Sequence, residues 1–256
     1  EEGSGKSYEA SGTTITFSEA VASGDSCYLV YMGSAQQTVT APAGSIVSSQ
    51  FSSADLVLPK TVTIGSAGAE DTKLVFDGNA QDYHVGLDDS EDKLTIGKGT
   101  ALGTTAHMTF DADGQILKPL QPAFLAKVTA VENFAVTTTH TMAFGTEIFD
   151  QGGNFSSNTF TAPVTGRYQF NIIVYFGQMN TDSNWLVVNF VTSNREYYAI
   201  VDPASFDQDQ TYYTMTINVL ADMDDNDTAG ISYYASGGTA QIDLNQHSYF
   251  SGFLAC

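Results

Sequence analysis

The chain has 256 residues and a formal net charge of −20, with only nine Lys plus Arg. So few cations exclude the clustered positive charge that a nucleic acid or an anionic membrane surface requires. Hydrophobic residues make up 42% and aromatic residues 12% of the chain, which excludes a disordered composition. The longest apolar runs fall far short of the roughly 20 residues of a membrane helix, so we expect no membrane insertion.

The first 58 residues are predicted to form a small N-terminal β module followed by a Ser-rich linker. Alternation with a period of two marks Ile15 and Phe17, then Tyr28, Val30 and Met32. Small turn-forming residues then dominate from Ala41 onward, which is typical of a linker.

Residues 59–118 are predicted to form a β-rich shaft module. Short apolar segments alternate with tight turns about every ten residues, which is typical of all-β folds. A single thin module of this kind cannot bury its own core. We therefore expect a homotrimer in which neighbouring chains cover Leu74, Phe76, Ile96 and Phe110.

Residues 119–256 are predicted to form a C-terminal jelly-roll β-sandwich, because nine candidate strands with wider turns suit two packed sheets. Phe170 and Phe253 are expected in its core. The candidate strands are residues 123–130, 141–149, 159–161, 166–176, 184–191, 197–201, 211–220, 228–234 and 247–254. The whole chain is thus predicted to be all-β.

Several segments of this last region resemble one family in order and spacing. They are Pro122-Ala123-Phe124, residues 144–149, residues 159–163 and 166–170 (Phe-Thr-Ala-Pro-x-x-Gly-x-Tyr-x-Phe), residues 184–188 and residues 249–254. The region resembles the globular head of the complement first-component q subunits, which implies a trimeric jelly roll of the tumour-necrosis-factor type. One departure is residues 221–227, where the family usually has Gly-Asp-x-Val.

The N-terminal segments are similar to stretches of bacteriophage tail fibres, notably residues 15–18, 22–25, 42–45, 76–79 and 85–89. The sequence contains no collagen-like Gly-x-y tract. The resemblance implies a virion tail-fibre tip, exposed to the extracellular medium, that joins upstream virion tail proteins and binds a host surface receptor, a glycan or an outer-membrane component. A secreted or cell-surface, adhesin-like recognition head and a polysaccharide depolymerase are the alternatives.

No catalytic motif is present, and we expect no enzyme. Gly-x-Ser-x-Gly, His-Glu-x-x-His and a Walker loop are missing, although a glycosidase-like carboxylate pair could arise by chance among so many acids. His84, His107, His140 and His247 lack ligand spacing and are interpreted as structural or surface residues. Cys27 and Cys256 are interpreted as free thiols, with an intermolecular bridge through Cys256 as the alternative.

Acidic turns provide the only metal candidates. Residues 222–227 place carboxylates at alternate positions, as a calcium loop does, but the sixth-position Gly and the distal Glu of an EF-hand are absent. The alternatives are therefore a calcium site and a solvated hairpin tip, and residues 88–92 pose the same choice. The calcium candidates are Asp222, Asp224, Asp225 and Asp227.

Recognition is expected in three polar loops, residues 179–183, 203–210 and 236–246, because scaffolds hold binding residues on strand connections. These loops are expected to contribute little to folding. The tyrosine pairs 197–198, 212–213 and 233–234 place one ring inward and one outward, where it could stack on a sugar, whereas Trp185 is interpreted as structural. The candidate receptor-binding residues are Asn180, Asp182, Ser205, Asp207, Gln208, Asp209, Gly238 and Asn245.

Overall fold

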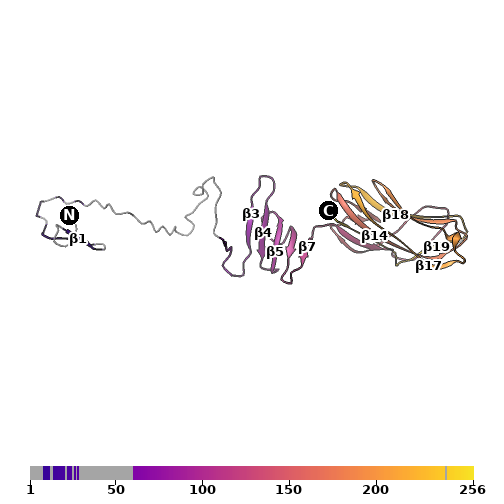
Figure 1. The fold of residues 1–256 in the computed structure, drawn as a ribbon, viewed down its shortest axis with the longest axis horizontal. Helices are drawn as coiled ribbons and strands as arrows, with labels where there is room; N and C mark the ends of the chain where they lie inside the picture. Colours follow the sequence, from indigo (N-terminus) through magenta and orange to yellow (C-terminus); the bar gives the residue numbers. More distant parts are fainter. Residues whose placement is uncertain are drawn as a thin grey trace. The chain divides into compact units, whose positions relative to one another are not determined.

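The computed structural model describes residues 8–11, 14–20, 22–24, 26, 28 and 60–256 except 240, in two compact units, 1–62 and 63–256 (Figure 1). In the first unit, β1 (Tyr8–Ser11) and β2 (Thr14–Phe17) form an antiparallel pair. Tyr28 is exposed and not in a strand, and residues 29–41 and the predicted Ser-rich linker lie outside the described residues. Within the described ranges, no helix is long and apolar enough to cross a membrane.

The predicted shaft region contains one antiparallel sheet whose five strands follow chain order. The strands are β3 (Thr72–Phe76), β4 (Tyr83–Asp88), β5 (Lys93–Lys98), β6 (Ala106–Phe110) and β7 (Ile116–Leu117). The strands β3 to β6 fit the predicted alternation of short apolar segments with tight turns, whereas β7 is too short to show an alternation. The register shifts between Ile96 and Gly97, which pair with Met108 and Ala106, so β6 contains a bulge at His107.

Among residues 60–256 that the structure describes, a loop covers one face of this sheet and the other face stays largely uncovered. His84, Thr95 and Ala106 are buried on that face, and Leu102 covers it in the loop after β5, so close that a Cβ on Gly86 would lie 2.9 Å from its Cδ2. The opposite face is here called the open face. It carries the apolar side chains that alternate along each strand with those of the covered face. It consists of Leu74, Phe76, Tyr83, Val85, Leu87, Leu94, Ile96, Met108, Phe110 and Ile116.

The C-terminal region is a sandwich of two antiparallel sheets with jelly-roll architecture, as predicted. The first, here called the β14 sheet, contains β8 (Ala123–Lys127), β9 (Glu132–Phe134), β11 (Thr146–Gln151), β14 (Gly166–Met179), β17 (Gln210–Met223), β19 (Ile242–Leu244) and β20 (Tyr249–Leu254). The second, the β15 sheet, contains β10 (His140–Thr141), β12 (Phe155–Ser156), β13 (Thr159–Thr161), β15 (Trp185–Thr192), β16 (Glu196–Val201) and β18 (Thr228–Ser236).

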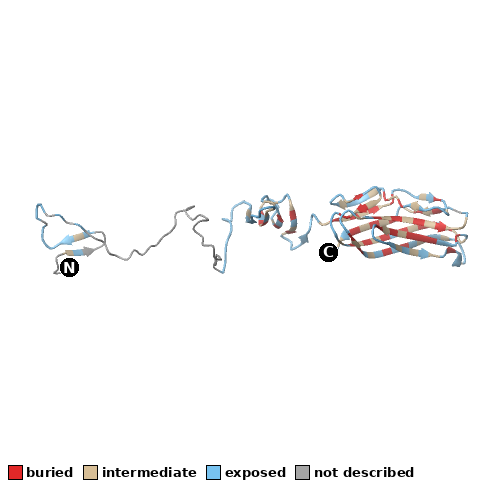
Figure 2. Cartoon of the chain, turned by 90° about the horizontal axis from the view of Figure 1, so that it is seen from above, coloured by how far each residue is buried: buried red, intermediate tan, exposed pale blue. Residues whose placement is uncertain are grey.

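Aromatic rings fill the space between the two sheets. Phe124 of the β14 sheet stacks on Phe155 and Phe160 of the β15 sheet, with ring centroids 4.8 and 5.0 Å apart. Phe170 is fully buried, as predicted, and its ring lies 4.9 Å from that of Phe190 across the core. Figure 2 shows the resulting alternation of buried and exposed residues along the long strands.

The structure corrects the predicted strand at residues 141–149, which is divided between β10 in one sheet and β11 in the other. The intervening residues 142–145 include the buried side chains of Met142 and Phe144 but form no strand. The strands β9, β12 and β19 were not predicted, because segments of two or three residues show no measurable period.

Two residues predicted to be structural are on the surface. Phe253 was expected in the core, but it is 44% exposed, because Phe250 and Gly252 take the inward parity of β20. Trp185 is 40% exposed, because Leu186, Val188 and Phe190 take the inward parity of β15. Each side chain therefore lies on an outer face of the sandwich.

We expect Phe170→Ala to lower the free energy of unfolding by about 3–5 kcal/mol, the usual cost of deleting a buried Phe side chain. Val164, which is 47% exposed, provides the control, and Val164→Ala should change the free energy by less than about 0.5 kcal/mol. Denaturant unfolding of both variants measures the difference. Equal midpoints would contradict the assignment of Phe170 to the core.

Candidate functional site

The three predicted recognition loops are held together at one end of the sandwich. Asp209 accepts hydrogen bonds from the Thr181 backbone nitrogen and hydroxyl, both at 2.9 Å, and from the Asn180 amide at 3.2 Å. Ser183 donates to the Gly237 carbonyl oxygen at 3.3 Å, which ties in the third loop. Loops that are 28 to 54 residues apart in sequence thus form one surface, here called the loop end.

A shallow cavity of about 240 Å³ lies in this loop end, and Asn180 and Asp209 line it together with Gln178 and Gln241. The other predicted residues lie elsewhere on the loops. Asp182 donates its backbone N–H to Asn180 Oδ1, and Asn245 accepts one from His247. Ser205 belongs to the 3₁₀ helix η2 (Pro203–Ser205), and Gly238, at a φ of +83°, packs against Ser183. Asp207 and Gln208 are exposed.

The expectation that these loops contribute little to folding is wrong for several residues, because Met179, Ile242 and Leu244 are fully buried in the hydrophobic core. Phe206, in the middle of the 203–210 loop, packs against the hydrophobic core, and its ring lies 5.7 Å from that of Tyr213. Changes intended to alter recognition alone must therefore keep Phe206 and the Asp209 hydrogen bonds.

The acidic turn between β17 and β18 is held by internal contacts. Arg195 donates to both carboxylate oxygens of Asp222, at 2.7 and 2.6 Å, and this interaction lowers the pKa of Asp222. Asp227 accepts from the Asp224 backbone nitrogen at 2.8 Å. Asn226 has a φ of +69°, a conformation that Asn tolerates better than most residues.

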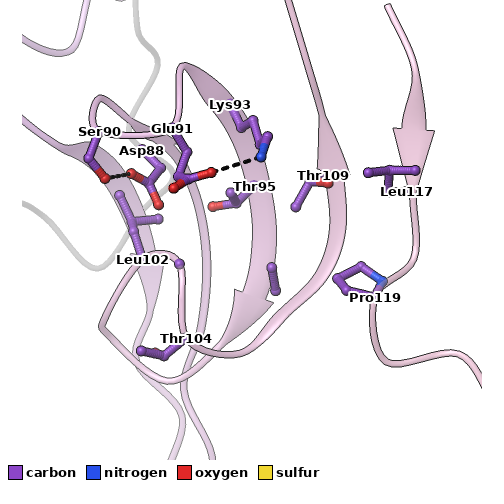
Figure 3. Close-up of a pocket in the computed structure, with 12 residues that line it drawn as sticks. Asp88, Ser90, Glu91, Lys93, Thr95, Leu102, Thr104, Thr109, Leu117 and Pro119 are labelled. Atoms are coloured by element: carbon purple, nitrogen blue, oxygen red, sulfur yellow. Dashed lines mark hydrogen bonds and ion pairs between the residues drawn. The ribbon is translucent and has the colours of Figure 1, made fainter. Parts of the chain in front are cut away.

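The second acidic segment, residues 88–92, borders a cavity of about 570 Å³ beside the covered face of the shaft sheet (Figure 3). Ser90 donates to Asp88 at 2.7 Å, and Glu91 pairs with Lys93 at 2.9 Å, which raises the pKa of Lys93. In the part of the chain that the structure describes, no three His, Cys, Asp or Glu side chains gather to hold a metal ion. Calcium binding therefore stays a prediction from sequence.

The histidines and Cys256 have surface or packing roles. His84 is buried and its Nδ1 lies 2.9 Å from the Gly99 carbonyl oxygen. His140 stacks on Tyr233, with centroids 5.3 Å apart. Cys256 is exposed and has a free thiol, and Cys27 lies outside the described residues.

The outer face of the β14 sheet carries apolar side chains that the sequence analysis did not assign to a surface. Phe253 pairs with Gln169, and Gln169 pairs with Leu220 on the next strand, so these three residues share that face. Phe149, Ile173, Leu220 and Phe253 are between 43% and 54% exposed. A scattered exposed Leu or Phe is ordinary, but several on one sheet face indicate an interaction surface.

The outer face of the β15 sheet has a second feature, a cleft of about 380 Å³. Trp185, Val187 and Asn189 of β15 form part of its lining, with Tyr198 of β16 and Tyr234 of β18. The prediction that one ring of each tyrosine pair faces inward is confirmed. Tyr233 is buried and Tyr197 and Tyr213 pack against the core. Their neighbours Tyr198 and Tyr212 are exposed, and Tyr234 lines this cleft.

Comparison with known proteins agrees with this architecture. Residues 123–255 match the model of the C1q domain. Similar solved structures include the globular domain of zebrafish complement 1qA (16% identity, 53% of this chain and 98% of that chain, TM-score 0.40) and murine APRIL (11% identity, 52% and 98%, 0.39). Another is Eiger TNF from S. frugiperda (9% identity, 54% and 92%, 0.36). No curated protein matches.

The loop end allows a test by titration. The Thr181 backbone N–H, and then its hydroxyl, lower the pKa of Asp209. A lowered folded-state pKa means that these bonds stabilise the fold at neutral pH, and that this stabilisation is lost as the pH falls through the lowered pKa. Thr181→Val removes the hydroxyl donor alone, so we expect the pKa of Asp209 to rise toward its ordinary value.

Carboxyl carbon NMR shifts followed against pH measure this change. Asp222 is the internal control, because Arg195 causes its lowered pKa and Thr181 does not contact it. An unchanged Asp209 midpoint in Thr181→Val would contradict the described geometry of the loop end.

Proposed function

Because residues 123–255 make this chain a member of the C1q domain family, we propose that it is a homotrimeric recognition protein whose C-terminal head binds a surface receptor. C1q domains are recognition heads that assemble as trimers and bind receptors. The observation that carries the proposal for this chain is the open face of the shaft sheet.

The open face supports assembly because it leaves large apolar side chains in water. Leu74 is 53% exposed, Phe76 60% and Ile116 57%, and they lie on the same side of one sheet. Burying apolar surface is favourable by about 25 cal/mol per Å², so contact with the same face of other copies removes this cost. Three copies that turn this face toward a common axis form a closed core, whereas an uncovered sheet face of this kind favours uncontrolled association.

The outer face of the β14 sheet supports the same assembly in the head. Its exposed apolar residues are Phe149, Ile173, Leu220 and Phe253. The polar residues Asn171, Thr216 and Ser251 lie on the same face of neighbouring strands. A mainly apolar face with small polar residues resembles the composition of homo-oligomer interfaces. The loop end remains free for a receptor in such an assembly.

We further propose that the protein is the tip of a virion tail fibre that binds a glycan or an outer-membrane component of the host. The similarity of the N-terminal segments to phage fibres supports this role. In this role the N-terminal module joins upstream tail proteins, and the head meets the host in the extracellular medium. The proposal assigns no catalytic step to the chain.

Leu74 and Val75 provide a matched test of assembly, because these neighbours on β3 point to opposite faces of the sheet. We expect Leu74→Glu to dissociate the trimer, since it places a charge at the apolar contact. Val75→Glu, at a residue that is 39% exposed, should leave the trimer intact. Sedimentation velocity measures the mass of each variant. A monomeric unaltered chain, or two variants with the same mass, would refute the proposed interface.

Receptor binding is tested with fluorescently labelled protein on a panel of bacterial strains. Asp207→Ala/Gln208→Ala alters the loop end but keeps Phe206 and Asp209, so we expect a folded trimer with at least about tenfold weaker adsorption. Asp224→Ala/Asp225→Ala, in the turn at the other end of β17, is the control and should adsorb normally. Full adsorption by the first variant would exclude these two side chains as receptor contacts, and adsorption of the unaltered protein to no strain would count against the fibre role.

A further inference from the structure

The cleft on the outer face of the β15 sheet combines aromatic walls with an amide floor. Strand parity builds it, because Trp185, Val187 and Asn189 are the outward residues of β15. Tyr198 pairs with Asn189 on one side, and Ser232 pairs with it on the other. The rings of Trp185 and Tyr234 are 5.1 Å apart at 35° and form one continuous wall.

Asn189 has an unusual environment at the base of this cleft. Its Oδ1 atom is buried and accepts no hydrogen bond from the described residues. A buried acceptor without a donor costs free energy, and nearly all such groups in native proteins have a partner. A ligand hydroxyl that enters beside Tyr198 would supply the donor. Tyr198 is 58% exposed, so its ring can turn aside at little cost in packing.

The volume and charge of the cleft restrict the ligand. About 380 Å³ falls within the roughly 300–1,000 Å³ of small-molecule sites. No charged side chain lines the cleft. The Tyr198 hydroxyl donates a hydrogen bond to Glu196, which is not among the lining residues. With a net charge of −20, the chain repels anionic ligands at such a site.

We propose that this cleft binds a neutral saccharide, with an apolar ring face on Trp185 and Tyr234 and a hydroxyl donating to Asn189 Oδ1. A sugar ring presents apolar C–H groups on its faces and hydroxyls at its edge, which matches an aromatic wall beside a single amide acceptor. The inference rests on the proposed role of the head in recognition, and it deepens that role by naming the ligand class and a site on the sheet face rather than in the loops.

A sheet face with exposed rings could instead contact a second copy of the chain. The combination of a concave cleft and an unpaired acceptor favours the sugar, because a hydroxyl satisfies Asn189 whereas an apolar side chain of another copy would leave it unpaired. The two occupants have different consequences. Loss of a sugar site leaves the assembly unchanged, whereas loss of a contact between copies alters its mass.

Trp185 is the only tryptophan in the chain, so its fluorescence reports directly on this cleft. The probes are neutral oligosaccharides of glucose, galactose, mannose and N-acetylglucosamine, with glucuronic acid and N-acetylneuraminic acid as anionic comparisons. We expect a saturable change in tryptophan emission with at least one neutral probe and a weaker response to both acids.

Asn189→Ala and Tyr234→Ala keep the tryptophan and should each raise the dissociation constant about tenfold, as expected for loss of a central contact. Tyr28→Ala changes an exposed tyrosine outside the head and should leave the constant unchanged. The far-ultraviolet circular dichroism and the sedimentation mass of every variant are measured in parallel.

The inference fails if no neutral probe gives a saturable response, or if both variants bind as the unaltered chain does. It also fails if Tyr234→Ala folds but has a different mass, because the face is then a contact between copies. The proposed trimer is tested separately, by the sedimentation mass of the unaltered chain. Its failure can therefore be distinguished from failure of the sugar site.

Discussion

The shaft sheet has two faces, and the described residues of one chain leave one of them largely uncovered. The loop that carries Leu102 closes the side with His84 and Thr95, and the open face keeps its apolar side chains in water. A single sheet needs a second layer to be stable, and copies of the same chain can supply that layer. The proposed assembly, and with it the presentation of the head, depends on this constraint.

In the head, the same two-residue alternation buries one face of each sheet, because two sheets of one chain pack face to face. The inward parity of β14 and β15 makes a core of stacked phenylalanines between the two sheets of one chain. The outward parity is then free for function, and the two outer faces differ. The β14 sheet presents Ile173, Leu220 and Phe253, which suits contact between copies, whereas the β15 sheet presents the cleft around Asn189.

Sequence alternation predicted the all-β fold and the long strands of the head to within a few residues. An alternation of period two that continues over eight or more residues is a clear signal of a strand. It failed at Phe253 and Trp185, where residue type suggested burial but parity places the side chain outside. Counting alternate positions from Phe250 or Phe190 would have found both. The loops meet at Asp209 through contacts between residues that are distant in sequence. A local pattern of alternation carries no information on such contacts.

The central claim is that the open faces of different copies of the chain are in contact, and distances between these copies test it most directly. Val85, at the centre of the sheet, is replaced by a spin-labelled cysteine in a chain whose Cys27 and Cys256 are changed to serine, and dipolar coupling is measured by pulsed electron resonance. The account predicts coupling between labels on different copies that disappears when labelled chains assemble with an excess of unlabelled ones. A label without coupling in the undiluted protein would show that the open face has another partner or none.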